Sequence, residues 1–269
     1  IANVGELTIS NSTFSDENQA ALGGALYTAG ESIMTLTNVT VSGNSATSGG
    51  GIYIAAPAII NFSTLTDNSG GGIYSDGFSY GIKNSIVADQ QTGANCDGTD
   101  PDSEGVNFAD DASCDGFINT STPLIEGLAF NVGQVYTHAL TETSPARDAA
   151  IDCTTVSGAD MTTDARNIAR PQGPECDAGA YEFGGDLHVT TTQMIQDGTD
   201  GKCSLPEAII AANTQNPSGS SNGECVPANS SPEIITLAPN QTYRMTQVDN
   251  TTQGPNGLPP VTFNNLYLQ

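Results

Sequence analysis

A repeated pattern in the first 90 residues constrains the fold of this chain more than any other feature. The segment Met34–Tyr53 is a typical copy, with alternating apolar residues, a Gly-Asn turn and three glycines that lead into a second apolar stretch. Strand-favouring residues are thus interrupted by turn-favouring residues, as expected for short β-strands joined by tight loops. Other copies occupy residues 7–27 and 59–74, and a fourth begins at Gly81.

The spacing of these copies predicts a solenoid. With Phe14, Val41, Leu65 and Val87 as equivalent positions, successive copies lie 27, 24 and 22 residues apart. Periods of this length, with strand and turn signals but no helix signal, are typical of a parallel β-helix. We therefore predict an all-β fold, a right-handed parallel β-helix whose coils stack about 4.8 Å apart.

Asparagine recurs at one position of the pattern, at Asn11, Asn38 and Asn84, while the third copy has Phe62 there. A polar turn residue that is repeated from coil to coil can bond its side-chain amide to the next one. We predict an asparagine ladder at this corner of the β-helix.

Tyrosine recurs at a second position of the pattern, at Tyr27, Tyr53 and Tyr74. Rings on successive coils can stack on one another, which is the preferred interpretation. A row of rings that binds sugars is the alternative.

The charge of the chain excludes two classes of partner. Thirty acidic residues against six basic ones give a formal net charge of -24. Binding to nucleic acid or to an anionic membrane requires clustered Lys and Arg, and the six basic residues are scattered. No apolar run approaches the roughly 20 residues of a membrane-spanning helix, so we expect no membrane insertion in this segment.

Six cysteines fall into three pairs of sequence neighbours, Cys96 with Cys114, Cys153 with Cys176, and Cys203 with Cys225. Each pair brackets a loop rich in Gly, Asp, Asn and Pro that has little apolar content of its own, and we predict a disulfide across each loop. Structural zinc is the competing interpretation, but no CxxC spacing occurs and the only histidines are His138 and His188. Disulfides indicate an oxidising, extracellular or cell-surface location.

The loop between the first two cysteines is crowded with carboxylates. We considered four of them as calcium ligands, namely Asp97, Asp100, Asp102 and Glu104. The loop lacks the ligand spacing of a known calcium loop, so a solvated acidic loop is the preferred interpretation. We predict no cofactor, with calcium as the alternative.

Several asparagines lie in N-x-S/T sequons, which are acceptors for N-glycosylation when the host supplies the machinery. Chains rich in Ser and Thr contain such sequons by chance. The candidates are Asn11, Asn38, Asn61, Asn119, Asn229, Asn240 and Asn250.

Residues 137–183 carry a family resemblance. The sequence THALTETSPARDAAIDC, followed by DARNIARPQGPECDAGAYEF, resembles the C-terminal region of the bacterial choice-of-anchor Q surface-protein domain, with Arg147 where that family has Ile. The resemblance extends over residues ~1–183 and implies a pectin-lyase-like right-handed parallel β-helix of a bacterial surface protein. We also expect Arg166 and Arg170 to pair with Asp164, Asp177 and Glu182, and so to tie this region to the last coil.

Residues 187–217 resemble a second family. The sequence LHVTTTQMIQDGTDGKCSLPEAIIAANTQNP is similar to the CSLREA domain, an element that usually precedes such a β-helix, with Pro206 where that family has Arg. The residues themselves predict a short capping helix near 205–213. Ser204 and Glu207 form a capping box, and four apolar residues make one stripe: Leu205, Ala208, Ile209 and Ala212.

These features divide the chain into three parts. We predict β-helix coils over 1–90, a disulfide-rich closing region over 91–184, and a CSLREA-like cap with the first strands of a following β-helix over 185–269. We expect the chain to be either a window of a tandem protein or a natural repeating unit. In both cases strand edges near Ile1–Ile9 and Ile234–Leu268 are free to pair with another chain.

We identify no catalytic and no cofactor-binding residues. A polysaccharide lyase or glycoside hydrolase on this scaffold needs a basic residue beside bound calcium, or paired carboxylates with nearby basic groups. The coils contain one Lys and neither Arg nor His. We therefore predict a non-enzymatic structural or adhesive surface protein.

Its predicted partners are further copies of itself, stacked head-to-tail into a fibre, or neighbouring modules of a longer stalk, and surface glycans. The alternative is a β-helix protein that binds or cleaves carbohydrate.

Overall fold

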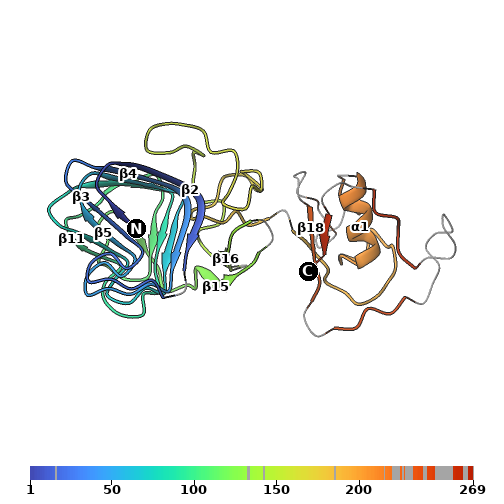
Figure 1. Ribbon diagram of the computed structural model, residues 1–269. Coiled ribbons are helices and arrows are strands. Elements are labelled where there is room, and N and C mark those ends of the chain that lie inside the picture. The colour runs from blue at the N-terminus through green and yellow to red at the C-terminus, as the bar shows by residue number, and fades with distance from the viewer. Residues whose placement is uncertain are drawn as a thin grey trace. The chain divides into compact units, whose positions relative to one another are not determined.

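A computed structural model describes the chain as two compact units, Ile1–Phe183 and Gly184–Gln269, and each is considered by itself. The described residues are 1–15, 17–131, 134–141, 143–184, 186–214, 216–219, 225, 227, 233–238, 241–245, 257–262 and 266–268. The first unit contains a parallel β-helix, whose coils are drawn from blue to green in Figure 1, and the second contains the helix α1, drawn in orange. The predicted fold class is thereby confirmed.

One wall of the β-helix, sheet A, consists of five short parallel strands in the order β1-β3-β5-β8-β11. Neighbours in this sheet are one coil apart. The strands are β1 Ala2–Asn3, β3 Leu26–Ala29, β5 Ile52–Ala55, β8 Ile73–Ser75 and β11 Cys96–Gly98.

The second wall, sheet B, contains nine parallel strands. They are β2 Glu6–Phe14, β4 Ile33–Ser42, β6 Ala58–Asn61, β7 Thr64–Thr66, β9 Tyr80–Lys83, β10 Ile86–Val87, β12 Asp102–Glu104, β13 Phe108–Ala109 and β14 Ile118–Asn119. Strand β4 pairs with β2 on one side and with both β6 and β7 on the other. The long strands of the first two coils thus become two short strands separated by a corner in later coils.

We number the coils by their strands in sheet B. The first coil contains β2, the second β4, the third β6 and β7, the fourth β9 and β10, and the fifth β12 and β13. Phe14, Val41, Leu65 and Val87 pair in register across the first four coils. The predicted alignment of the copies is therefore confirmed.

The corner of sheet B is a left-handed backbone position in four successive coils. Its residues are Asn11, Asn38, Phe62 and Asn84, with φ of 45°, 55°, 44° and 51°. Asparagine is one of the few residues other than glycine that often adopts this conformation, because its short polar side chain bonds to nearby groups. Phenylalanine does not, so the third coil requires another source of stability.

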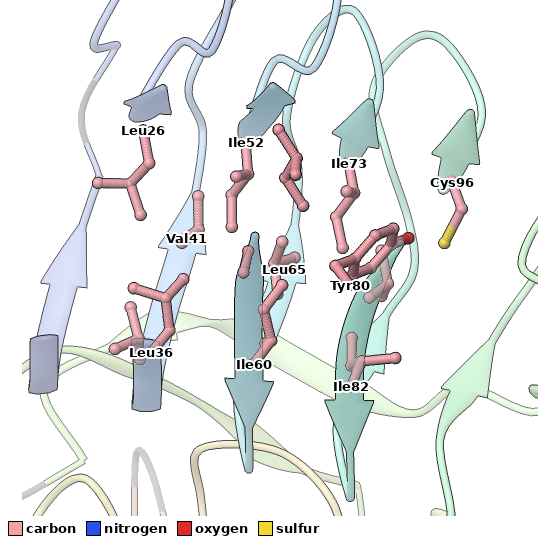
Figure 2. Packing of buried hydrophobic residues seen from close by; sticks show 14 of the residues in the cluster. Leu26, Leu36, Val41, Ile52, Ile60, Leu65, Ile73, Tyr80, Ile82 and Cys96 are labelled. Carbon is pink, nitrogen blue, oxygen red and sulfur yellow. The ribbon is translucent and has the colours of Figure 1, made fainter. Parts of the chain in front are cut away.

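The interior of the β-helix is filled by side chains. Figure 2 shows aliphatic residues from both walls meeting there, with Leu26, Ile52 and Ile73 from sheet A opposite Leu36 and Ile60 from sheet B. All five have no exposed surface. Cys114 and Phe117 join the same cluster next to the fifth coil, so the loop closed by the Cys96–Cys114 disulfide fills the far end of the interior.

Tyr80 is the polar exception in this interior, with only 1% of its surface exposed. Its hydroxyl is buried without a hydrogen-bond partner among the described residues, and burial raises the pKa of its phenol. A buried unpaired hydroxyl costs about 1–3 kcal/mol.

We expect Tyr80→Phe to raise the free energy of unfolding by about 1 kcal/mol in urea titrations. Tyr74→Phe, on the outer face of sheet A, serves as the control, and a loss of stability in Tyr80→Phe would contradict the prediction.

The second unit has its own small core. Strands β17 Asp186–His188, β18 Glu233–Thr236 and β19 Leu266–Leu268 form a parallel sheet in the order β17-β18-β19. Helix α1, Leu205–Thr214, packs against it through Leu205, Ala208, Ile209 and Ala212. The predicted capping helix is confirmed, one residue longer than expected.

The N-terminus of α1 is closed by the predicted capping box. The backbone N–H of Glu207 donates to Ser204 Oγ at 3.3 Å, and the Ser204 N–H donates to the Glu207 carboxylate at 2.9 Å. These reciprocal bonds satisfy amide groups that the first turn leaves without partners.

Three disulfides join neighbours in sequence: Cys96–Cys114, Cys153–Cys176 and Cys203–Cys225. Each closes its loop within one unit. Among the described residues, no helix is long and apolar enough to cross a membrane.

Candidate functional site

Part of the outer surface of the β-helix is covered by a later segment of the same chain. Residues 120–183, which we call the clasp, begin after β14 and contain the antiparallel strands β15 Ile125–Ala129 and β16 Thr137–Leu140. The clasp runs back along the flank of sheet B and contacts the first four coils. Its contacts are Tyr136 with Thr13 and Asn167 with Asn11 in the first coil, Thr163 with Asn38 and His138 with Ser42 in the second, Val156 with Asn61 and Ala180 with Thr64 in the third, and Asp152 with Lys83 and Asn84 in the fourth.

Most of these contacts join a side chain of the β-helix to the backbone of the clasp. The amide of Asn38 donates to the Thr163 carbonyl at 2.9 Å, and the amide of Asn84 donates to the Asp152 carbonyl at 3.1 Å. In the other direction, the Val156 N–H donates to the Asn61 carbonyl oxygen at 2.8 Å. These hydrogen bonds hold the clasp against the flank and bury the three asparagines.

A second core lies between the clasp and sheet B. Ile86 and Phe108, on the outer side of β10 and β13, pack against clasp residues Leu140, Ala178 and Tyr181. The region predicted to close the β-helix thus consists of two parts. The loop up to Phe117 fills the end of the interior, and the clasp covers the flank.

The predicted asparagine ladder is present at its first step only. Asn38 Nδ2 donates to Asn11 Oδ1 at 3.1 Å. Phe62 interrupts the ladder in the third coil, and Asn84 turns its amide toward the clasp instead.

A second ladder, which we did not predict, lies at the turn after sheet B. Its members are Asn18, Asn44, Asn68 and Gln90, joined by side-chain bonds of 2.8, 3.0 and 3.2 Å. The recurrence of asparagine 24 residues apart, at Asn44 and Asn68, was the available sequence signal.

Two of the candidate glycosylation sites are inaccessible in the folded chain. Asn38 and Asn61 are 1% and 2% exposed, and the amide nitrogen of each donates a hydrogen bond. Asn11 is half-buried and bonded to Asn167, whereas Asn119 is exposed in β14. Asn229, Asn240 and Asn250 lie outside the described residues.

The clasp contains a buried network of charged groups. Arg166 pairs with Asp164 at 2.7 Å and Arg170 with Glu182 at 2.8 Å, and all four side chains are fully buried. Arg170 also donates to the backbone carbonyls of Asp177 and Gly179. Both arginines therefore pair with carboxylates as expected.

The network contacts two coils. Arg170 lies over the Phe62 ring of the third coil, 4.8 Å from its centroid, and donates to the Gly179 carbonyl, while the Gly179 N–H donates to the Asn84 carbonyl of the fourth coil at 2.8 Å. Because its charged side chains are fully buried, the network can stabilise the clasp but cannot reach a substrate.

The network contains more carboxylates than arginines, and this shifts their pKa values. Burial raises the pKa of Asp177 to about 7, with a further contribution from the neighbouring Glu182 carboxylate. Burial also raises the pKa of Glu182. Both carboxyls therefore resist ionisation in the folded chain more than in the unfolded one.

This difference predicts a pH dependence of stability. The folded chain holds the Asp177 proton to a higher pH than the unfolded chain, so this stabilisation is present below the unfolded pKa and is lost as pH rises through about 7. We expect the free energy of unfolding to fall as the pH rises from about 4 to about 7, between the unfolded and folded pKa values, and to level off above that in urea titrations. Asp177→Asn should flatten this decline, and an equal decline in that variant would refute the assignment to Asp177.

His138 has a structural role, since it joins the clasp to the second coil. Its Nδ1 lies 2.7 Å from the Glu126 carbonyl and its Nε2 lies 2.9 Å from Ser42 Oγ. A carbonyl only accepts, so Nδ1 carries the proton and Nε2 accepts from the serine. Burial lowers the pKa of His138, which favours this neutral form. The other histidine, His188, belongs to β17.

The four calcium candidates lie at the far end of the stack. Asp97 is exposed in β11, Asp102 and Glu104 are exposed in β12, and Asp100 is exposed between these strands. Asp102 accepts a hydrogen bond from Ser79 at 2.7 Å. Within the described part of the chain, no three or more His, Cys, Asp or Glu side chains form a group that could hold a metal. The absence of a cofactor stays a prediction, with calcium as its alternative.

The tyrosine row lies on the outer face of sheet A. Ring centroids are 5.5 Å apart between Tyr27 and Tyr53 and 5.0 Å apart between Tyr53 and Tyr74, with interplanar angles of 24° and 16°. The rings thus present their faces to one another and their edges to solvent. A sugar stacks on a ring face, so this geometry favours the aromatic stack over a sugar-binding row.

One family model matches part of the repeat. It is described as the Chlamydia polymorphic membrane protein (Chlamydia_PMP) repeat and matches residues 38–55, from the corner of β4 to the end of β5. No curated protein and no solved structure matches the chain. The resemblances of residues 137–183 and 187–217 stay predictions.

Proposed function

We propose that this chain is a structural module of an extracellular or cell-surface protein, in which a stiff β-helix joins end to end with further coils. Three disulfides favour an oxidising location. The match to a repeat of polymorphic membrane proteins is consistent with a surface β-helix protein. In this proposal residues ~1–183 are a choice-of-anchor Q type domain and residues ~187–269 a CSLREA-type domain.

The observation that carries this proposal is the difference between the two ends of the β-helix. In the second coil Met34, Leu36 and Val41 have no exposed surface. Their partners in the first coil, Leu7, Ile9 and Phe14, are only half-buried. Strand β2 pairs with β4 alone among the described strands, so its outer edge presents both apolar side chains and unpaired backbone groups.

The far end differs in the side chains that it presents. Cys114 and Phe117 fill the interior there, and the edge strands β11 and β12 carry Asp97, Asp102 and Glu104. Charged residues on an edge strand oppose pairing with another strand. Further coils are therefore expected to stack on the first coil, either from a second copy in a head-to-tail fibre or from a neighbouring module of a longer chain.

Electron microscopy and analytical ultracentrifugation of the purified chain test the proposal. We expect concentration-dependent oligomers or filaments with a regular repeat. Ile9→Lys places a charge at the apolar edge and should reduce association, whereas Ser103→Lys, on β12 at the far end, should not.

A chain that stays monomeric at all concentrations would contradict self-association. Cleavage of an acidic polysaccharide on incubation would instead support the carbohydrate-cleaving alternative.

A further inference from the structure

The segment 261–268 has the same pattern as the strands of sheet B. Four segments align without insertions across the first four coils, with strand pairing on both sides of the corner, namely LTISNSTF (7–14), MTLTNVTV (34–41), AIINFSTL (58–65) and YGIKNSIV (80–87). The sequence VTFNNLYL of residues 261–268 aligns with all four, with an asparagine at the corner position. It is the one other eight-residue stretch of the chain in which we find this pattern.

The interior positions of this pattern are the first, third, sixth and eighth. In the second coil they are Met34, Leu36, Val39 and Val41, all without exposed surface. In residues 261–268 all four positions are apolar, being Val, Phe, Leu and Leu. The segment therefore carries a complete set of interior residues for one coil.

The described members of this set, Val261, Leu266 and Leu268, are only partly buried within the second unit. Val261 is 57% exposed and Leu268 is 60% exposed, although Leu266 packs partly against the core there. Strand β19 pairs with β18 on one side, and no described strand pairs with its other side. Among the described strands, β19 thus has a free edge, as β2 does, while the Thr262 N–H donates to Asn213 Oδ1 at 2.7 Å.

From these observations we infer that residues 261–268 of one copy stack on the free edge of β2 of a second copy, as the coil that precedes its first coil. The inference rests on the proposed end-to-end association and names its two surfaces and their register. Val261 pairs with Leu7, Thr262 with Thr8, and Leu268 with Phe14. The half-buried side chains of the first coil are then covered as those of the second coil already are.

Charge favours this pairing over stacking on the far end of another copy. The segment 261–268 contains no charged residue, and β2 contains only Glu6. Stacking on the far end would instead place Asp102 and Glu104 of β12 against β2, and Asp97 of β11 against β1, in a chain with a net charge of -24. Like charges on paired strands are destabilising, so the neutral segment is the better partner.

Two single-cysteine variants test the register directly. Thr8→Cys and Thr262→Cys replace exposed residues, and no native cysteine is free to compete. Residues that face each other on parallel strands about 4.8 Å apart are within the Cα separation of a disulfide. The two variants carry different tags and are mixed at equal concentration under mild oxidation. We expect a cross-linked heterodimer, with residues 8 and 262 joined in the peptide found by mass spectrometry.

Thr242→Cys is the matched control, since Thr242 is also exposed but lies outside the segment. We expect at least tenfold less heterodimer between Thr8→Cys and Thr242→Cys. Adding Ile9→Lys to Thr8→Cys should lower the 8–262 yield while circular dichroism shows an intact fold.

An 8–262 yield no higher than that of the control overturns the inference. If ultracentrifugation then still shows oligomers, the proposed self-association stands and only this register is wrong. If it shows monomers alone, both the register and the proposed self-association fail.

Discussion

Replacing Phe62 with alanine is expected to lower the free energy of unfolding of the first unit by about 3–5 kcal/mol. The ring is fully buried between the corner of the third coil and the clasp. It packs there with Ala150, Cys176 and Met161, and the Arg170 guanidinium lies over its face. Removing the ring leaves a cavity and also takes away the surface that Arg170 covers.

Urea titration followed by circular dichroism measures this loss. Phe78→Ala is the matched control, because Phe78 is 38% exposed, and it should cost much less. Phe62→Asn adds a second comparison. Asparagine suits the left-handed φ of 44° and could extend the ladder from Asn38, yet it cannot replace the ring. If Phe62→Ala costs less than about 1 kcal/mol, Phe62 does not anchor the clasp.

Replacing Arg170 with alanine is expected to cost a similar amount, about 3–5 kcal/mol, because it leaves buried carboxylates without a counter-charge. The Glu182 carboxylate accepts from Arg170 at 2.8 Å, and neither side chain has any exposed surface. Asp177 lies in the same network and already resists ionisation. Loss of the guanidinium should raise the pKa of both carboxyls further, so the variant should lose most stability above pH 7.

A double variant separates the ion pair from the packing. Arg170→Met with Glu182→Leu removes both charges and keeps apolar volume, and it should be more stable than Arg170→Ala alone. Arg170→Lys keeps the charge but lacks the planar fork that reaches the Asp177 and Gly179 carbonyls, and it should fall between the two. Equal stability of Arg170→Ala and the original chain would show that the pair contributes nothing to the clasp.

The repeating part of the fold was predictable because its signals are local and periodic. Each coil offers apolar residues at the same spacing, so the register of Phe14, Val41, Leu65 and Val87 follows from aligning the copies. The capping box of Ser204 and Glu207 lies within a single helical turn. Pairing of cysteine neighbours follows from loops that have no core of their own.

The clasp was not predictable in the same way. Its contacts join residues more than 65 positions apart, such as Asn84 with Asp152 and Asn38 with Thr163. In most of them the clasp contributes a backbone carbonyl or N–H. Because every non-proline residue has both groups, these hydrogen bonds leave no signal in the sequence. The burial of Asn38 and Asn61, which removes two candidate glycosylation sites, follows only from this packing.

The sequence by itself determined the β-helix, its register, its disulfide loops and the capping helix, because neighbouring residues and a constant period encode each of them. Only the tertiary structure decided which faces remain open. The clasp covers the flank of sheet B, the Cys96–Cys114 loop fills one end, and the apolar edge of β2 is left exposed. The physical reason is that exposure depends on which distant segments pack on a surface, and that packing depends on shape and backbone hydrogen bonds more than on any repeated pattern of residues.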